Sequence, residues 1–136
     1  MRRSIIELCV ADHRDDPIIL DRWLANKQPE VTRGWIASTT GSMLVAVEGE
    51  AVLAVGGVTD AGEITLNYVS PDARFRGVSK AMLKALEARA KERGNRRCTL
   101  LSTQTAHRFY LAAGYDNDGA PINKVGSPGQ PMAKAL

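Results

Sequence analysis

Cysteine is scarce in this chain, and neither copy belongs to a recognisable motif. Cys9 and Cys98 lack C-x-x-C spacing and stand in apolar surroundings. A disulfide-stapled scaffold needs more cysteines, and a zinc site needs clustered ligands, so the pattern favours neither class. His13 and His107 also stand apart from any ligand spacing. We therefore expect both thiols in the core, both histidines to be structural or exposed, and no metal.

Long apolar runs are also missing. No segment approaches the ~20 apolar residues that a bilayer-spanning helix requires. The N-terminal sequence MRRSIIELCV begins with basic residues, but Glu7 and then Asp12 interrupt its apolar stretch too early for a secretory leader. We expect a soluble, cytoplasmic protein with no membrane partner.

Two common phosphate-binding motifs do not occur. There is no G-x-x-x-x-G-K-[ST] sequence, and no G-x-G-x-x-G opens a helix, so nucleotide hydrolysis and dinucleotide binding lose their usual support. Aromatic residues make up only 5% of the chain, and its basic residues are dispersed. A nucleic-acid binder would show clustered cations with interleaved aromatics, so that alternative is not favoured.

The remaining composition indicates a small globular protein with an anionic ligand. The 136 residues fit a single domain over positions 1–136, without internal repeats. Lys and Arg number 18 against 15 Asp and Glu, a net charge of +3 with a pI near 9.1. This excess of positive charge suits an anionic ligand or partner.

The most informative stretch is VSPDARFRGVSKAML, residues 69–83. An apolar strand, residues 63–69, ends at Pro71 and Asp72, and a helix begins near Gly77. Val78, Met82, Leu86 and Ala90 recur every four residues, with Ala81 and Ala85 widening the stripe, so one face of this helix should be buried. Unpaired N–H groups in the first turn, beside Arg74, Arg76 and Lys80, predict an anion site. The alternative is an ordinary basic loop before a surface helix.

The rest of the chain reads as alternating strands and helices. We predict a first strand at residues 5–11, a helix from Pro17 to about Asn26 capped by Asp16, and a second helix from Pro29. Strands at 43–47 and 51–58 form a hairpin, with a bulge at Gly56 and Gly57. A strand at 98–102, parallel to residues 63–69, precedes a helix capped by Thr103 or Thr105 and stopped by Gly114. Residues 116–130 read as a loop and 132–136 as a closing strand.

Two motifs resemble the GNAT acetyltransferases. The spacing Arg74-x-x-Gly77-x-Ser79 resembles the family's Q/R-x-x-G-x-G/A signature, with Ser79 in place of the final Gly or Ala. The segment AHRFYLAAGY, residues 106–115, resembles its A-x-x-F-Y-x-x-x-G-F/Y segment. The resemblance covers residues 63–115 and implies an α+β GNAT fold, with a mixed, mostly antiparallel sheet flanked by helices.

The resemblance also implies acetyl-CoA as cosubstrate and two strands, residues 63–69 and 98–102, that splay apart to receive it. The expected cofactor-binding residues lie along the first strand, the helix start and the segment after the second strand. They are Tyr68, Val69, Arg74, Phe75, Arg76, Gly77, Val78, Ser79, Lys80, Thr103, Ala106 and Phe109.

Two residues are candidates for catalysis. Glu63 resembles, by position, the basic glutamate of histone-type members, although it reads equally well as a solvated residue at a strand start. Tyr110 matches the tyrosine that assists the departing CoA sulfur, or else is one more aromatic on the stripe of Ala106, Phe109 and Ala113. An amine must lose its proton before it attacks a thioester, so a base or a water relay is required.

The sequence therefore predicts an N-acetyltransferase that moves an acetyl group directly from acetyl-CoA to an amine. A small-molecule acceptor is favoured over a protein amine, and a homodimer is possible. A thiol buried in an apolar strand is a poor nucleophile, so Cys98 is not expected to carry the acetyl group. The alternative from another class is an acyl-CoA-binding regulatory module without turnover.

Overall fold

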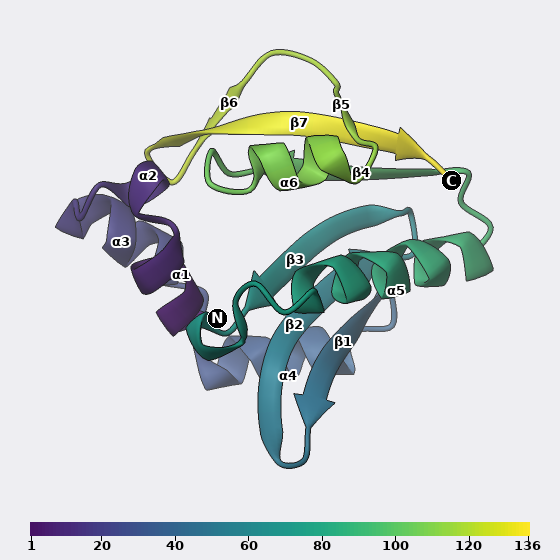
Figure 1. The fold of residues 1–136 in the computed structure, drawn as a ribbon, viewed down its shortest axis with the longest axis horizontal. Helices are drawn as coiled ribbons and strands as arrows, with labels where there is room; N and C mark the ends of the chain where they lie inside the picture. The colour runs from purple at the N-terminus through teal and green to yellow at the C-terminus, as the bar shows by residue number, and fades with distance from the viewer.

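The computed structural model describes all 136 residues and is built on a seven-stranded sheet in the order β1-β2-β3-β4-β7-β5, with β6 paired to β7 (Figure 1). The strands are β1 (Gly41–Glu48), β2 (Ala51–Thr59), β3 (Glu63–Val69), β4 (Arg97–Ser102), β5 (Asp116–Asn117), β6 (Ile122–Lys124) and β7 (Ser127–Ala135). The helices are α1 (Arg2–Leu8), α2 (Val10–His13), α3 (Pro17–Leu24), α4 (Pro29–Ala37), η1 (Pro71–Ala73), α5 (Val78–Glu92) and α6 (His107–Ala112).

The sheet is mixed, with one parallel pair. β3 and β4 run parallel, and every other pairing is antiparallel. Because a parallel neighbour requires a crossover, α5 connects these two strands over one face of the sheet. The predicted fold class, an α+β architecture with a mostly antiparallel sheet, is confirmed.

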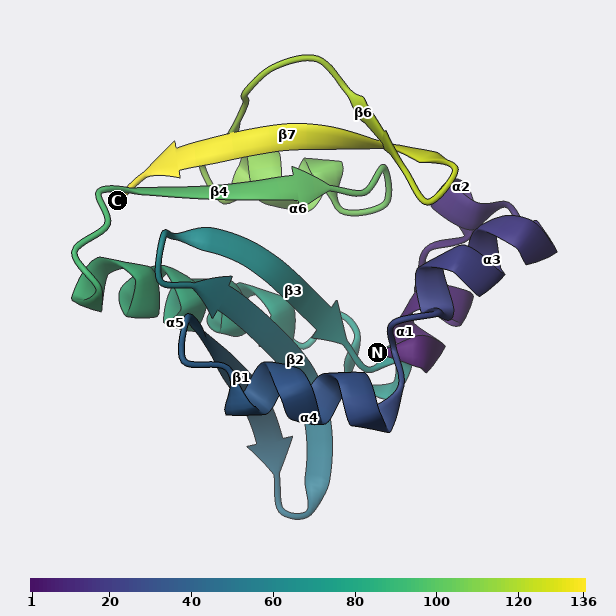
Figure 2. The ribbon, with the colours of Figure 1, turned by 180° about the vertical axis from the view of Figure 1, so that it is seen from behind.

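The helices cover both faces and one end of the sheet. α5 and α6 lie on one face, α4 crosses the other, and α1 to α3 gather at one end (Figures 1 and 2). None of the helices is both long and apolar enough to cross a membrane. The end occupied by α1 to α3 is the one toward which β3 and β4 move apart.

Most of the core lies between α5 and the sheet. Met82, Leu86 and Ala90 are buried at the predicted spacing of four, and they pack with residues of β2, β3 and β4. The prediction that Ala81 and Ala85 widen this stripe is wrong, because both are exposed and Leu83 is buried in their place. The buried face of α5 therefore includes Leu83 and excludes Ala81 and Ala85.

Gly56 of β2 allows α5 to approach the sheet closely. A Cβ atom on Gly56 would stand 2.6 Å from the Met82 Sδ atom and 2.9 Å from a Leu86 methyl carbon. The pairing of β2 with β3 shifts register between Gly57 and Val58, which confirms the predicted bulge. Side chains of α5 thus occupy the space that Gly56 leaves empty.

The predicted first strand at residues 5–11 is wrong, because this segment forms α1 and α2. Ile5, Cys9 and His13 are buried four residues apart, whereas Ile6 and Val10 are 42% and 45% exposed. The hydrogen bonds from Cys9 N to Ile5 O and from His13 N to Cys9 O follow the same period. β-branched residues raise strand propensity, but here the helical spacing of buried residues decides the structure.

The predicted loop at residues 116–130 is also wrong in part. It contains β5, β6 and the first residues of β7, which starts at Ser127 and pairs with β4 from Arg97↔Ala135 to Ser102↔Gln130. Pro128, Gly129 and Pro131 all lie within β7, and this composition reads as a loop. A Cβ atom on Gly129 would stand 2.7 Å from a Leu101 side-chain carbon, so a close approach between strands requires glycine there.

Candidate active site

The start of α5 offers backbone donors that no protein group uses. Gly77 is the N-cap, with φ +76, and no side chain caps the helix. No hydrogen bond in the structure uses the N–H groups of Val78, Ser79 or Lys80. A Cβ atom on Gly77 would meet nothing within 4 Å, so the space in front of these donors is open. Such a helix end favours a bound anion.

The loop between η1 and α5 places the positive charge of Arg74 at the surface. The Ser70 hydroxyl accepts a hydrogen bond from Asp72 N at 3.3 Å and so caps η1, after which the chain turns toward α5. Phe75 has φ +62 and is 90% exposed, and the Arg74 guanidinium carbon lies 4.5 Å from the centroid of its ring. Arg74 therefore remains close to the open helix end.

β3 and β4 separate soon after they pair. Their register contains only Glu63↔Thr99 and Ile64↔Leu100, whereas β3 continues to Val69. Main-chain groups of residues 65–69 that face β4 thus have no strand partner. The predicted divergence of these two strands is confirmed, and it exposes a strand edge to which an extended ligand can add.

A cavity of about 410 Å³ occupies this opening and runs to the start of α5; we call it the α5 cavity. It brings together the predicted catalytic Tyr110 and nearly all of the predicted cofactor-binding residues. The latter are Tyr68, Val69, Arg74, Phe75, Gly77, Val78, Ser79, Lys80, Thr103, Ala106 and Phe109.

Two predicted site residues do not reach this cavity. Arg76 points to the β1–β2 hairpin, where its Nη2 atom lies 2.6 Å from a carboxylate oxygen of Glu48. Glu63 is exposed at the beginning of β3, in the part still paired with β4, and lines neither this cavity nor the one described below. The site geometry gives these two residues no contact with a ligand in either cavity.

Tyr110 lines the α5 cavity and is 7% exposed. Its ring makes edge-to-face contacts with Phe109 and Tyr115, at centroid distances of 5.1 and 5.7 Å. The Asn67 side-chain amide donates to the Tyr110 hydroxyl oxygen at 3.4 Å, which leaves the hydroxyl hydrogen free. Burial raises the pKa of Tyr110, so this phenol is a proton donor at neutral pH.

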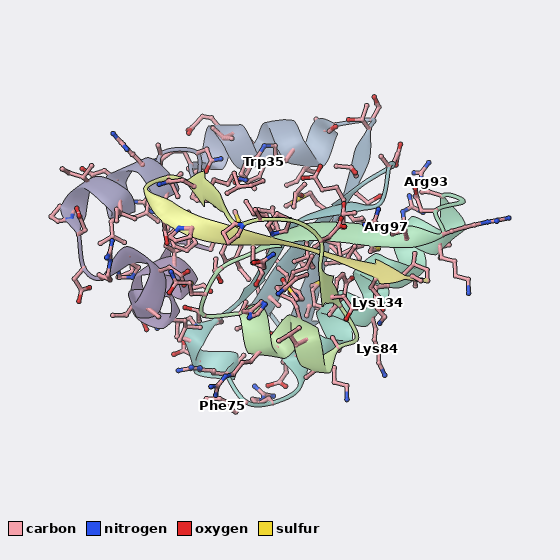
Figure 3. The ribbon with its side chains drawn as sticks, turned by 90° about the horizontal axis from the view of Figure 1, so that it is seen from above. Trp35, Phe75, Lys84, Arg93, Arg97 and Lys134 are labelled. Atoms are coloured by element: carbon pink, nitrogen blue, oxygen red, sulfur yellow. The ribbon has the colours of Figure 1, made fainter.

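A second cavity, of about 430 Å³, lies on the face of the sheet covered by α4; we call it the α4 cavity. Trp35 of α4 and Phe75 of the α5 loop lie on opposite sides of the molecule in Figure 3. The two cavities share Thr65, Leu66, Tyr68, Leu101 and Thr103, all from β3, from β4 or directly after it. They therefore meet where the two strands diverge.

Asp12 was not identified from the sequence, yet it organises one wall of this site. Its carboxylate accepts hydrogen bonds from Gln104 N at 2.6 Å, from Thr105 N at 3.1 Å and from the Thr105 hydroxyl. The prediction that Thr103 or Thr105 caps the following helix is wrong, because the N-cap of α6 is Ala106 and no side chain caps it. Thr103 accepts from Ala106 N at 3.2 Å, and Thr105 binds Asp12. No local sequence pattern predicts a contact between residues as far apart in the chain as Asp12 and Thr105.

His13 and the two cysteines have structural environments. The Nδ1 atom of His13 accepts from Asp15 N, so its proton resides on Nε2, which donates to two backbone carbonyls of α1. Cys9 and Cys98 are free and buried, as expected, and burial raises the pKa of Cys9 to about 12. No three His, Cys, Asp or Glu side chains are grouped closely enough to hold a metal ion.

Comparisons with known proteins agree with this architecture. A solved GCN5-related N-acetyltransferase from Rhodopseudomonas palustris is similar over 99% of this chain and 84% of its own, with a TM-score of 0.87 and 22% identity. The PaiA N-acetyltransferase of Thermoplasma acidophilum, solved with coenzyme A, matches over 99% and 87%, with a TM-score of 0.83 and 17% identity. A GNAT family acetyltransferase of Elizabethkingia anophelis with acetyl-CoA bound matches over 90% and 93%, with a TM-score of 0.61 and 17% identity. No curated protein matched the sequence.

The fold is a sheet opened between two parallel strands, with two cavities that meet at the opening. The family model of the GNAT acetyltransferase domain matches residues 9–136. The chain therefore belongs to the GNAT acetyltransferase family, and the resemblance drawn from its two motifs is confirmed.

Proposed function

We propose that this protein is an acetyl-CoA-dependent N-acetyltransferase acting on a small amine. The observation that carries the proposal is that two cavities enter from opposite faces and meet between β3 and β4. A reaction in a ternary complex needs this arrangement, because thioester and amine must reach one point from separate entrances. The coenzyme A and acetyl-CoA bound in two of the similar structures support the choice of cosubstrate.

The α5 cavity has the donors that a CoA molecule requires. The free N–H groups of Val78, Ser79 and Lys80, with the side chains of Arg74 and Lys80, would bind its diphosphate. The unpaired edge of residues 65–69 would bind the amides of its pantetheine arm like an added strand. Together these contacts would place the thioester beside Tyr110.

Tyr110 is assigned to the leaving group. The amine nitrogen bonds to the thioester carbonyl carbon, the C–S bond breaks, and Tyr110 donates its proton to the departing sulfur. The nitrogen releases its proton to water, and the Tyr110 phenolate regains a proton from water, which restores the enzyme. Asn67 positions the phenol by donating to its oxygen, so that the phenol hydrogen is directed elsewhere. The products are an N-acetylated amine and free CoA.

No carboxylate in the α4 cavity is free to act as the base. Glu63 lies outside both cavities, and both oxygens of Asp12 already accept hydrogen bonds. We therefore assign removal of the amine proton to water, which carries it to solvent through the open α4 cavity.

The test is amine-dependent release of CoA. Purified protein is incubated with acetyl-CoA and a panel of small amines, free thiol is followed with a chromogenic disulfide, and the N-acetylated product is identified by mass spectrometry. Turnover that depends on both substrates is expected. Tight CoA binding without thiol release for any amine would favour the non-catalytic acyl-CoA-binding module instead.

A further inference from the structure

The α4 cavity carries more positive than negative charge. Its charged lining consists of Arg22, Lys27 and Lys124 against the single carboxylate of Asp12. Asp12 is 2% exposed, and its oxygens are occupied by the backbone and hydroxyl of the Gln104–Thr105 turn. None of the three cations forms an ion pair with a protein carboxylate.

Lys27 is the most buried of the three cations that give the α4 cavity its excess of positive charge. It is only 8% exposed, and its Nζ atom has one hydrogen-bond partner, the Asn26 side-chain oxygen at 2.6 Å. An ammonium group has three hydrogens to donate, and burying a cation without an anion is costly. Two donor positions on a buried cation in the cavity wall therefore have no protein partner.

The surroundings hold this ammonium group in place without neutralising it. Nζ lies 5.7 Å from the ring centroid of Trp35 and 6.0 Å from that of Tyr68. These rings attract a cation weakly compared with a carboxylate. Burial lowers the pKa of Lys27 and nearby Lys124 lowers it further, so an anion between the two lysines would relieve both effects.

We propose that the acceptor amine carries a carboxylate, which binds Lys27 and Lys124 between the Trp35 and Tyr68 rings of the α4 cavity. This inference rests on the proposed acetyltransferase function and names its substrate class, small amino-acid-like amines. Cationic acceptors such as polyamines are disfavoured, because the cavity lining repels them. The tyrosine ring also lines the α5 cavity, so an acceptor held there lies at the junction of the two cavities.

The experiment compares amines that differ only by the carboxylate. Leucine is paired with 3-methylbutylamine and phenylalanine with phenethylamine, and kcat/KM is measured for each. An α-carboxylate also lowers the pKa of the neighbouring amine, so kcat/KM is expressed per unprotonated amine. On this basis the wild type is expected to favour the carboxylate-bearing member by about 10-fold or more. Equal use of both members, or preference for the simple amines, would overturn the proposal and leave the acetyltransferase function standing.

Variants of Lys27 test whether this residue causes the preference for carboxylate-bearing amines. Lys27→Met should lower the ratio of kcat/KM for leucine over 3-methylbutylamine by about 10-fold, while Lys27→Arg should keep most of it. Lys84→Met is the matched control, since Lys84 is an exposed lysine of α5 that lines neither cavity. An unchanged ratio in Lys27→Met would overturn the assignment.

Binding provides a readout that does not depend on turnover. Trp23 and Trp35, the only tryptophans of the chain, both line the α4 cavity, so their fluorescence reports its occupancy. Isovalerate, a carboxylate without an amine, should change this fluorescence in the wild type and bind at least about 10-fold more weakly to Lys27→Met. If no amine is acetylated, the proposed function fails while this titration still decides the inference, and the absence of isovalerate binding would overturn it.

Discussion

Gly77 combines two properties that no other residue type can supply at the start of α5. Its φ of +76 strains any side chain with a Cβ, and the space in front of it is empty. In Gly77→Val the side chain would enter that space and cover the unused N–H groups of the first turn. We expect the Kd for CoA to rise by at least about 10-fold, measured by isothermal titration calorimetry.

Gly94, at the other end of α5, provides the control for backbone strain. Its φ is +88, nothing lies within 4 Å of an added Cβ, and it lines neither cavity. Gly94→Val should therefore lose comparable stability but retain its CoA affinity. If both variants lost affinity equally, strain in the helix, rather than the anion site, would explain the result.

The hydroxyl of Tyr110 is the only part of that residue assigned to chemistry. Tyr110→Phe keeps the ring contacts with Phe109 and Tyr115 and removes the proton donor, so kcat should fall by about 10- to 100-fold while CoA affinity stays unchanged. Steady-state kinetics and calorimetry separate the two quantities. Tyr115→Phe is the matched control, because Tyr115 is also a buried tyrosine and lines neither cavity. A wild-type kcat in Tyr110→Phe would return Tyr110 to a packing role.

Glu63 tests whether a carboxylate removes the amine proton. The exposed Glu63 side chain lies outside both cavities, so Glu63→Gln should change kcat by less than about twofold across the pH range of activity. A loss of about 100-fold or more, with a matching change in the pH profile, would make Glu63 the base and contradict the water route.

At the scale of elements, Asp12 joins two parts of the chain that are distant in sequence. Its carboxylate connects α2 to the turn between β4 and α6, which carries Thr103 at the junction of the cavities. Asp12→Asn replaces one acceptor oxygen with a donor, which faces N–H groups, so the free energy of unfolding should fall by about 2 kcal/mol. Urea denaturation measures this change; Asp21→Asn, at an exposed position, should leave stability unaltered, and equal effects would show that the turn does not depend on Asp12.

The elements nearest the α5 motif were the most predictable from sequence. β3 has the predicted bounds, and α5 and β4 begin within a residue of their predicted starts, because glycine, proline and periodicity all agree there. The predictions for two segments nearer the ends of the chain were wrong for opposite reasons. Residues 5–11 have strand composition but helical spacing, and residues 127–131 have loop composition but pair along β4 in the fold. Their structure depends on tertiary contacts, which local patterns do not contain.

The candidate site also has one part that could be predicted from the sequence and one part that could not. The residues predicted to bind CoA come from β3, the start of α5 and the segment after β4, and all but Arg76 line the α5 cavity. The α4 cavity was not predictable, because Lys27, Trp35 and Lys124 come from three separate segments, each of which reads as ordinary surface sequence. Acceptor recognition therefore becomes visible only once the chain is folded.

The whole molecule is arranged around the interruption between β3 and β4. Continuous pairing would have given a stronger sheet, yet β3 keeps only two residue pairs with β4 before they separate. The sheet is held on either side of the opening by the long β1–β2–β3 meander and by β7, which pairs along all of β4. The opening can thus be maintained without a ligand, since each half is stabilised by its own pairing and by the helices that cover it.

Lys27, like the opening between β3 and β4, should lower the stability of the fold while serving function, and unfolding of Lys27 variants should show this. A buried ammonium without a counter-ion destabilises the folded state, so Lys27→Met should raise the free energy of unfolding at neutral pH by about 1 kcal/mol even as acceptor preference is lost. Burial, and then Lys124, lower the pKa of Lys27. Burial, and then Lys27, lower the pKa of the Met1 amino group.

This lowered pKa fixes the direction of the pH dependence. Between the folded-state pKa of Lys27 and the value of about 10.4 for an unfolded lysine, the unfolded chain binds more protons than the folded chain. Stability contributed by this group therefore rises with pH across that window, and the advantage of Lys27→Met should shrink as pH increases. Urea unfolding of the wild type, Lys27→Met and the exposed Lys84→Met from pH 7 to about 10.4 covers this window and tests the prediction. A constant difference between wild type and Lys27→Met would mean that Lys27 is solvated and carries no unpaired buried charge for an acceptor to neutralise.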